Sequence, residues 1–237
     1  MKKRIWELDV LRGVCILGMV VVHLIYDLQT FFSLPFLADS QLFDLIKQWG
    51  GVLFLLISGI CVTLGSHPVR RGLIVFACGL LCSAVTAGMF LLHMADKSII
   101  IYFGVLHCLG VCMLLWPLFK RLPVWALGLL GLGLTVLGLW ISGNVVVDFP
   151  WLIPLGLVPG DFASSDYFPL LSNLGFFLVG AFLGKTLYRK KETLLPRVNP
   201  ANPVLAFFTP LGKWSLPVYL LHQPIITGLL YLILEIL

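Results

Sequence analysis

Apolar residues gather in seven long runs along the chain, separated by shorter segments that hold most of the polar residues. The runs cover residues 10–28, 49–64, 72–92, 99–119, 124–142, 170–187 and 214–236. A helix of about 20 apolar residues crosses the hydrocarbon core of a bilayer, and runs near this length indicate membrane-spanning helices. The pattern predicts an all-α integral membrane protein of seven transmembrane helices, with residues 1–237 forming a single polytopic domain.

The composition excludes a soluble fold. Of the 237 residues, 59% are hydrophobic and 11% are charged, whereas an ordinary soluble domain has roughly 25% charged residues. So few ionisable side chains do not cover the surface of a soluble protein, but a bilayer accepts an apolar exterior. The net charge of +5 does not indicate nucleic-acid binding, because basic residues of membrane proteins collect in cytoplasmic loops.

The distribution of basic residues predicts the orientation of the chain. If the amino terminus is cytoplasmic, fourteen of the sixteen basic residues lie in inner segments, and the outer segments keep only Lys47 and Lys97. The inner ones are Lys2, Lys3, Arg4, Arg12, Arg70, Arg71, Lys120, Arg121, Lys185, Arg189, Lys190, Lys191, Arg197 and Lys213. We therefore expect the amino terminus inside and the carboxyl terminus outside. The seven tryptophans fall at or near the ends of the runs, where indole rings prefer the headgroup region.

The sequence lacks the signs of a secreted, disulfide-bonded protein. Its start, MKKR, is similar to a signal peptide, but Glu7, Asp9 and Arg12 interrupt the apolar run and no small-residue cleavage site follows. The six cysteines all lie inside apolar runs, which favours small buried side chains over a disulfide framework. No nucleotide-binding, zinc-binding or nucleophile-elbow motif is present, and the sequence predicts no metal site.

Four polar side chains of the first run lie on one face of the predicted helix. At 100° per residue, Arg12 and His23 are about 20° apart around the helix axis and about 17 Å apart along it. Asp9 and Asp27 each lie about 40° from His23 around the axis. Ionisable residues within a span are costly, so this stripe should face the interior of the helix bundle or a water-filled cavity.

Each residue of the stripe also has a plainer explanation. Arg12 is compatible with an anchor at the cytoplasmic interface, and His23 with a hydrogen bond between helices. Alternatively, a neutral imidazole at His23 accepts a proton or attacks an acyl group, and Asp27, one turn later, either orients this ring or caps the outer end of the helix.

Two further histidines lie within apolar runs. His107 lies about 12 Å below the outer end of the fourth run, between Gly104 and Gly110, which let another helix approach closely. His222 precedes Gln223 and Pro224 in the inner half of the last run, where the proline frees a carbonyl and bends the helix. His107 is a catalytic candidate and His222 a candidate for the inner, cofactor end of a polar path, and both are equally compatible with packing roles.

Five segments, taken in order, resemble one family. The separation of Arg12 from His23 matches the arginine, ten residues, histidine signature of the transmembrane acyltransferase superfamily. The segments together resemble the bacterial relatives of heparan-alpha-glucosaminide N-acetyltransferase; they are LDVLRGVCILGMVVVH, LFLLISG, FGVLHCLG, DYFPLLSNLGFFLVG and GKWSLPVYLLHQP. The resemblance extends over nearly the whole chain.

The resemblance implies transfer of an acetyl group from cytosolic acetyl-CoA, through the membrane, to an amino sugar or glycan acceptor outside. It implies that His23 is the catalytic base or acyl carrier. Asp27 and His107 are further catalytic candidates because of their positions within the spans. Arg12 would bind the phosphorylated coenzyme, with Asp9 and His222 as further candidates at that end. It also implies a bacterial plasma or inner membrane. A homo-oligomer is compatible with the sequence, and the identity of the acceptor is left open.

Two other classes of function use the same polar residues. A transporter or flippase would use the polar path to move a small amphipathic or glycan-linked solute across the membrane, without a chemical reaction. A non-catalytic membrane subunit would use the histidines only for hydrogen bonds between helices. Paired interrupted short helices, which are typical of many transporters, are not convincingly present, and our interpretation is an acyl-CoA-dependent transferase.

Overall fold

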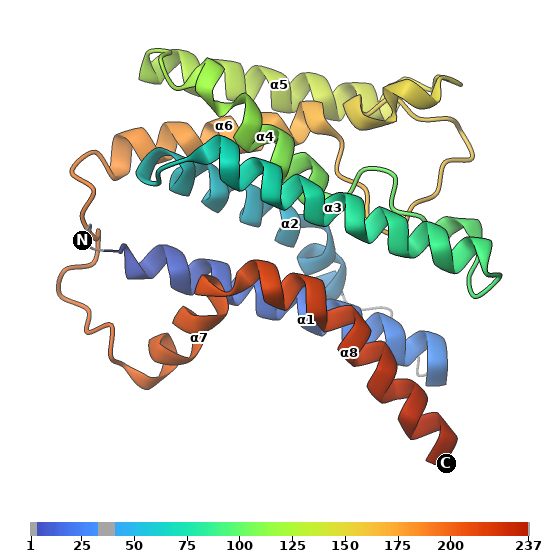
Figure 1. The fold of residues 1–237 in the computed structure, drawn as a ribbon. Helices are drawn as coiled ribbons and strands as arrows, with labels where there is room; N and C mark the ends of the chain where they lie inside the picture. The colour runs from blue at the N-terminus through green and yellow to red at the C-terminus, as the bar shows by residue number, and fades with distance from the viewer. Residues whose placement is uncertain (1–3, 33–40, 237) are drawn as a thin grey trace. The chain divides into compact units, whose positions relative to one another are not determined.

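The computed structural model describes residues 4–32 and 41–236, in which every regular element is a helix (Figure 1). The α-helices are α1 (Trp6–Phe32), α2 (Gln41–Leu64), α3 (Pro68–Leu91), α4 (Val105–Phe119), α5 (Val124–Asn144), α6 (Leu170–Leu187), α7 (Pro203–Lys213) and α8 (Ser215–Ile236). Two short 3-10 helices are η1 (Lys97–Ile99) and η2 (Pro150–Leu155). Lys2 and Lys3, which contribute to the predicted orientation, lie outside the described residues.

Within the described residues, five helices are long and apolar enough to cross a membrane. They are Trp6–Gln29, Pro68–Leu91, Val124–Asn144, Leu170–Leu187 and Ser215–Ile233. The other two predicted spans correspond to the shorter apolar helices Trp49–Leu64 and Val105–Phe119. The all-α, multi-pass membrane architecture is therefore confirmed, whereas the number of seven spans and the orientation of the termini stay predictions.

The chain forms two compact units. Unit 1 contains Met1–Phe54 and Lys190–Leu237, so both ends of the sequence belong to the same unit. Unit 2 contains Leu55–Arg189. The division falls within α2, whose last turns belong to unit 2.

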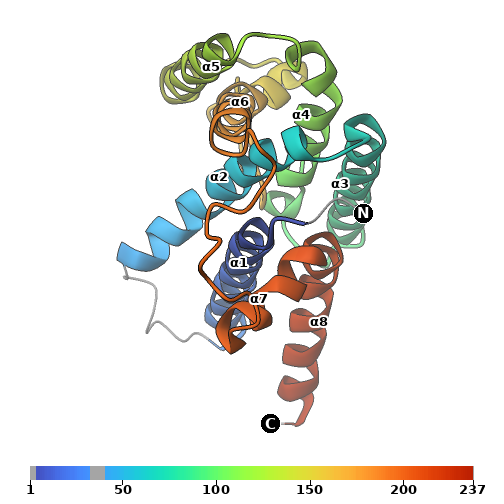
Figure 2. The same cartoon turned by 90° about the vertical axis from the view of Figure 1, so that its left-hand side faces the viewer.

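In unit 1, α7 and α8 both pack along α1 (Figures 1 and 2). The backbones of α1 and α7 touch because each helix presents a glycine to the other. A methyl group at Gly13 would collide with the Phe208 carbonyl, and one at Gly212 would collide with the Asp9 carbonyl. Small residues allow this close approach between membrane helices. Further along α1, α8 replaces α7 as the neighbouring helix.

The hydrophobic pattern does not predict α7, which lies between the last two predicted spans. Its start is well defined: Asn202 Oδ1 accepts a hydrogen bond from the Val204 amide at 3.0 Å, and Pro203 occupies the first turn. Asparagine at the cap followed by proline is a common start of a helix. With 11 residues, α7 is too short to cross a bilayer, and its role is to pack against α1.

In unit 2, α3 packs against α4, and α6 packs against both α5 and α4. The end of α2 lies on α6, where Gly59 faces the Phe177 carbonyl and Gly180 faces the Leu56 carbonyl. None of the six cysteines, all of which lie in the described residues, forms a disulfide bond. The core of unit 2 contains side chains with no exposed surface, namely Leu55, Cys108, Cys112, Leu127, Phe177, Leu178 and Ala181.

The helix α4 begins later than the sequence predicts. The apolar run starts at residue 99, but residues 100–104 are not helical and α4 begins at Val105. The hydroxyls of Ser165, Ser164 and Ser83 donate hydrogen bonds to the carbonyls of Ile99, Ile100 and Ile101 at 2.6, 2.9 and 2.6 Å. These carbonyls therefore need no helix to satisfy them, and β-branched isoleucines favour extended backbone. As a result, His107 lies in the first turn of α4 and not two turns below its start.

The glycine contact between α1 and α7 predicts that Gly13→Ala destabilises the protein. The methyl group meets the Phe208 carbonyl, and overpacking of this kind typically costs about 1–3 kcal/mol. We expect a lower midpoint of thermal unfolding for the purified protein in detergent.

Gly18→Ala in the same helix is the matched control, because the atom nearest to its methyl group is Ile46 Cγ2 at 3.9 Å. Alanine stabilises a helix interior relative to glycine by about 1 kcal/mol, so this variant should unfold at the same temperature as the parent protein or higher. Equal midpoints for the two variants would contradict the packing of α7 on α1.

Candidate functional site

One continuous helix carries the whole polar stripe of the first span. Because α1 is unbroken from Trp6 to Phe32, Asp9, Arg12, His23 and Asp27 keep their predicted spacing. Asp9 and Asp27 are 4% and 5% exposed, and Arg12 and His23 are partly buried. The two carboxyl groups are therefore enclosed by protein.

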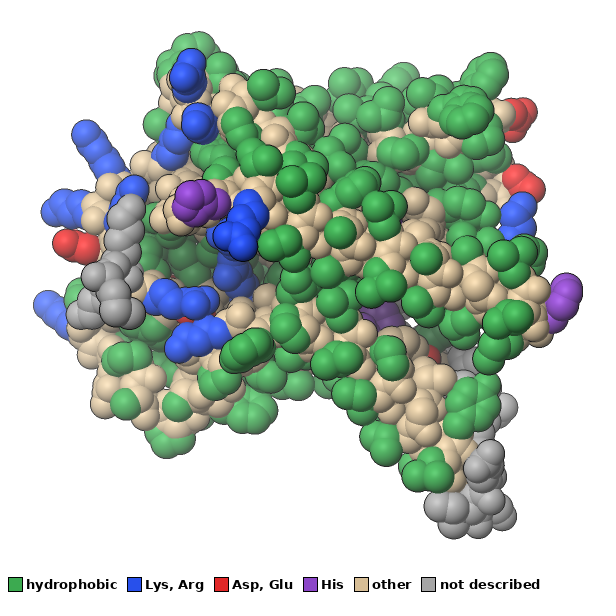
Figure 3. Space-filling model, in the orientation of Figure 1, with side chains coloured by type: hydrophobic (Ala, Val, Ile, Leu, Met, Phe, Trp, Pro, Cys, Tyr) green, Lys and Arg blue, Asp and Glu red, His purple; other side chains and the backbone are tan. Residues whose placement is uncertain are grey.

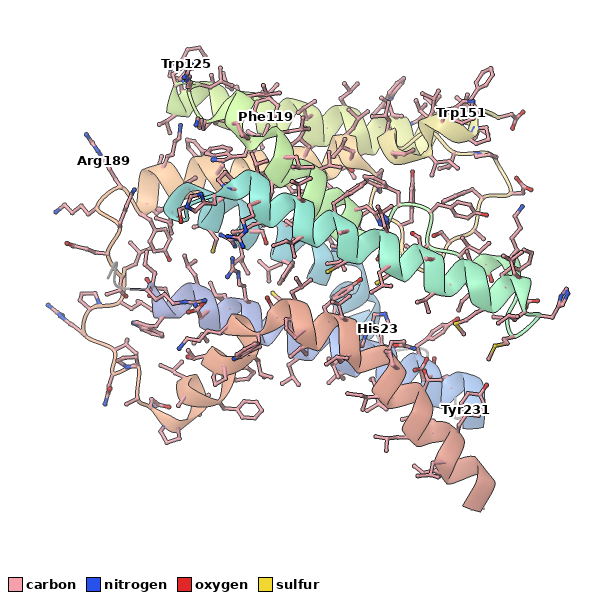
Figure 4. All side chains as sticks on the ribbon, in the orientation of Figure 1. His23, Phe119, Trp125, Trp151, Arg189 and Tyr231 are labelled. Atoms are coloured by element: carbon pink, nitrogen blue, oxygen red, sulfur yellow. The ribbon has the colours of Figure 1, made fainter. Side chains whose placement is uncertain are left out.

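His23 of α1 lies beside His222 of α8. The two ring centroids are 4.8 Å apart, and the ring planes meet edge to face at 77°. Figure 4 shows His23 at the place where α8 passes over α1. The sequence pattern predicts that His222 lies at the coenzyme end of the path near Arg12, but in the structure its ring adjoins His23, the predicted catalytic histidine.

Backbone carbonyls fix the position of the hydrogen on both rings. His23 Nδ1 is 2.9 Å from the Met19 carbonyl oxygen, and His222 Nδ1 is 2.6 Å from the Tyr219 carbonyl oxygen. A carbonyl oxygen can only accept, so Nδ1 donates in each ring and Nε2 of the neutral ring carries a lone pair. His222 Nε2 is buried and has no hydrogen-bond partner among the described residues. His222 therefore presents a basic nitrogen atom that has no hydrogen-bond partner in the described part of the chain, beside the ring of His23.

A carboxylate and an amide complete this cluster. Gln223 Nε2 donates a 2.8 Å hydrogen bond to Asp27 Oδ2, one helical turn beyond His23 on α1. Gln223 Oε1 is buried and lacks a partner within the described part of the chain. We call His23, Asp27, His222 and Gln223 the α1–α8 cluster. Gln223 is the one member of this cluster that the sequence pattern does not predict as a site residue. The signal for it is its side-chain amide, which in an apolar helix requires a hydrogen-bond partner within the protein.

Arginines surround Asp9 near the start of α1. Arg4 Nε and Nη2 donate to the two carboxylate oxygens of Asp9 at 2.9 and 3.0 Å. Arg12 Nη1 lies 3.9 Å from Asp9 Oδ1, while Arg12 Nε is buried without a hydrogen-bond partner in residues 4–32 and 41–236. Asp9 is thus engaged by Arg4, and part of the Arg12 guanidinium stays available for a ligand.

His107 belongs to unit 2, and both of its ring nitrogens have partners. Nδ1 accepts a hydrogen bond from the Gly104 amide at 3.2 Å, and Nε2 is 3.3 Å from Ser83 Oγ. Because Ser83 Oγ donates its own hydrogen to the Ile101 carbonyl, Nε2 of His107 is the donor to Ser83. The residue is 3% exposed. These bonds leave neither nitrogen free for proton transfer and join the start of α4 to α3.

The segment before α6 closes the same end of unit 2. Asp166 Oδ2 accepts a 3.0 Å hydrogen bond from the Val105 amide, which satisfies one of the free donors in the first turn of α4. Tyr167 donates its hydroxyl to the Ile153 carbonyl at 2.7 Å. Burial raises the pKa of Tyr167 to about 12, so the phenol keeps its hydrogen at neutral pH.

Within the described residues, no group of three or more His, Cys, Asp or Glu side chains is placed to hold a metal ion.

Comparison with known protein families identifies the family of this chain. The sequence model of the family described as heparan-alpha-glucosaminide N-acetyltransferase, catalytic, matches residues 4–224. The chain belongs to this family. No curated protein and no solved structure matches the chain. The match to the heparan-alpha-glucosaminide N-acetyltransferase catalytic family begins before α1 and extends past Gln223, so it contains the whole α1–α8 cluster.

The segments that carry the family resemblance form two clusters in the structure. Segments 8–23 and 212–224 provide His23, His222 and Gln223 in unit 1. In unit 2, the segment around His107 meets the segment that starts at Asp166. The first cluster holds buried polar atoms without partners among the described residues, whereas both ring nitrogens of His107 in the second cluster have hydrogen-bond partners.

The hydrogen bonds of His107 predict that His107→Ala destabilises the protein. The substitution removes the acceptor of the Gly104 amide and leaves a cavity in the core, and the two effects together typically cost about 2–4 kcal/mol. We expect a clearly lower thermal unfolding midpoint in detergent.

His93→Asn is the control, because His93 is exposed and asparagine tolerates its left-handed backbone, with φ of 57°. This variant should unfold like the parent protein. If His107→Ala unfolded at the parent temperature, the structural role of His107 would be wrong.

Proposed function

We propose that the protein is a membrane-embedded acetyltransferase that moves an acetyl group from cytosolic acetyl-CoA to an amino sugar or glycan acceptor on the outer side of the membrane. Membership of the heparan-alpha-glucosaminide N-acetyltransferase catalytic family supports acetyl transfer. The apolar helices support a multi-pass location. The proposal includes a cytoplasmic amino terminus and the plasma or inner membrane of a bacterium.

The observation that carries this proposal is the His23–His222 pair. Both rings donate from Nδ1 to a backbone carbonyl, so each Nε2 is left as a base or nucleophile. The rings lie together at 4.8 Å, on two helices that the family match covers. General base catalysis requires an imidazole nitrogen with a free lone pair, held in a fixed orientation. The α1–α8 cluster supplies two of them.

In direct transfer, the acceptor N–H or O–H group gives its proton to Nε2 of one histidine while its nitrogen or oxygen attacks the acetyl carbon. The new C–N or C–O bond forms, and the C–S bond of the thioester breaks. The sulfur leaves as a thiolate and takes the proton from the imidazolium. In the alternative route, Nε2 attacks the acetyl carbon first, the C–S bond breaks and the coenzyme leaves as a thiolate. The acceptor nitrogen or oxygen then attacks the acetyl carbon, the C–Nε2 bond breaks, and the acceptor proton passes through the freed Nε2 to the thiolate. Both routes yield the acetylated acceptor and the free coenzyme thiol.

Asp27 supports this chemistry through its charge. A carboxylate one helical turn from His23 stabilises an imidazolium that forms on that ring. The hydrogen bond from Gln223 Nε2, at 2.8 Å, holds the carboxylate in place. Gln223 is thus a positioning residue, and its unpartnered Oε1 adds an acceptor for a hydroxyl or amine of the substrate.

Arg12 is proposed to bind a phosphate of the coenzyme. Its side chain is 13% exposed, and its Nε hydrogen has no partner in the described residues. Guanidinium groups bind phosphate through paired hydrogen bonds. Along α1, Arg12 is about 17 Å from His23, a separation that suits a donor whose thioester lies at the end of a long flexible arm.

The first prediction of this proposal concerns the histidine pair. His23→Asn and His222→Asn should each lower acetyl transfer by at least about a hundredfold, the usual contribution of a general base. The measurement is acceptor-dependent release of free coenzyme A from acetyl-CoA, by purified protein in vesicles, with a panel of amino sugars and glycans. His93→Asn, on an exposed loop residue, should keep full activity.

Full transfer by both His23→Asn and His222→Asn would contradict the assignment of the pair. Movement of a solute across the vesicle membrane without acyl-CoA would indicate a transporter. Failure to bind acyl-CoA at all would indicate a non-catalytic subunit.

The second prediction concerns Arg12. Arg12→Lys keeps the positive charge but removes the planar fork that pairs with phosphate, so coenzyme affinity should fall by about tenfold, the equivalent of one charge-assisted hydrogen bond. Equilibrium dialysis with labelled coenzyme measures it. Unchanged affinity would leave Arg12 as an interfacial anchor only.

A further inference from the structure

A basic cavity lies at one end of unit 2, in a region that the proposed chemistry does not use. It has a volume of about 500 Å³ and opens where α2 ends, α3 begins, and α4 and α6 end. Its charged lining residues are Lys120, Arg121 and Lys185, and Trp116 forms part of its wall. Pockets for small organic ligands have volumes of about 300–1,000 Å³, so the cavity is large enough for such a ligand.

Most charges of unit 2 are divided between its two ends, and Lys97 is the one Lys or Arg of this unit at the acidic end. Its four acidic residues, Asp96, Asp148, Asp161 and Asp166, all lie in the segments 92–104 and 145–169 at the far ends of the helices. The cavity end carries Arg70, Arg71, Lys120, Arg121, Lys185 and Arg189. Figure 3 shows basic side chains gathered at one end of these helices and acidic ones at the other. Figure 4 places Phe119, Trp125 and Arg189 at the cavity end and Trp151 at the opposite end. No carboxylate of unit 2 therefore lies at the cavity end.

Lys185 is held in a fixed position at the wall of the cavity. Its Nζ donates to the Lys120 carbonyl at 2.7 Å and to the Leu122 carbonyl at 3.3 Å, and it lies 5.6 Å from the centroid of the Trp116 ring. An ammonium group has three hydrogens, so one remains for a ligand. Lys120 and Arg121 are exposed, and both are free to close on an anion.

The chemistry of this lining suits a phosphate ester. Two ammonium groups and a guanidinium provide charge-assisted hydrogen bonds to phosphate oxygens. Trp116 and Val62 add an apolar wall for the organic part of the ligand. Such a ligand has two sources at a membrane surface, namely a phosphorylated coenzyme in solution and the headgroup of an anionic phospholipid.

We propose that this cavity binds the phosphate groups of a phosphate-ester ligand through Lys120, Arg121 and Lys185. If the proposed acetyl transfer is correct, on which this identification rests, the ligand is the donor coenzyme. The cavity then supplies a phosphate site separate from Arg12. Its affinity for phosphate does not depend on the α1–α8 cluster.

The test is equilibrium dialysis of the full-length protein, in nanodiscs of zwitterionic lipid, with labelled pyrophosphate and with coenzyme A. The double variant Lys120→Gln, Arg121→Gln removes two charge-assisted hydrogen bonds, and we expect it to weaken binding of both probes by at least about tenfold. The matched control is Arg70→Gln, Arg189→Gln, which removes two exposed charges from the same end of unit 2 without touching the cavity lining. At physiological salt the control should lose less than about twofold, because screening weakens charges at a distance.

Unchanged binding in the cavity variant, or an equal loss in the control, would overturn the proposal. A third arm uses nanodiscs with anionic phospholipid and measures, by native mass spectrometry, the lipid that stays bound. Retention of that lipid by the parent protein but not by the cavity variant, without affinity for coenzyme A, would assign the phosphate site to a headgroup. If the cavity variant and the control variant lost equal affinity for pyrophosphate, coenzyme A and lipid, the binding would come from a general basic surface. That result would overturn the cavity site.

His23→Asn separates this inference from the proposed function. That variant should bind pyrophosphate as the parent protein does while losing transfer. Phosphate binding that depends on Lys120 and Arg121, in a protein that catalyses no transfer, would keep the cavity site and reject the acetyltransferase. Transfer that depends on His23, with phosphate binding unaffected by the cavity variant, would keep the acetyltransferase and reject the cavity site.

Discussion

Lipid offers no hydrogen-bond partners, so every polar group in the apolar helices has to find its partner within the protein. In unit 1 this requirement brings Asp27 of α1 to Gln223 of α8. It also brings the buried Glu7 carboxylate to Thr193 and to the Leu194 amide at 2.9 and 2.8 Å. Each of these bonds joins the beginning of the sequence to its end. The same requirement that builds unit 1 therefore gathers Asp27 and Gln223 beside the His23–His222 pair.

Close backbone contact makes these bonds possible. Gly13 and Gly212 let α1 and α7 touch, and α8 follows α7 along α1. Without a Cβ atom at either position, the helices come near enough for side chains as short as aspartate to reach across. These two glycines thus bring α7, which directly precedes α8, onto the helix that carries His23.

Unit 2 meets the same requirement in a different way. Around His107, hydroxyl groups, the Asp166 carboxylate and backbone amides satisfy one another, so this region is stable and closed. The opposite end keeps cations without an acid of the same unit beside them. A membrane protein holds unpaired charges at an interface only where water or a ligand can reach them. The two ends of unit 2 therefore differ: the end around His107 is closed by hydrogen bonds, and the opposite end has a cavity lined by Lys120, Arg121 and Lys185.

The sequence by itself determined the membrane class, the approximate spans, the family and the stripe of polar residues on α1. These are local properties: the length of an apolar run is compared with a bilayer of fixed thickness, and Arg12, His23 and Asp27 share a face because an α-helix has a fixed rotation per residue. The tertiary structure decided which histidines meet. That His222 joins His23, that Gln223 holds Asp27, and that α4 begins at Val105 with His107 fully bonded all depend on partners far away in the sequence. Such partners are selected by the packing of whole helices, which no local pattern contains.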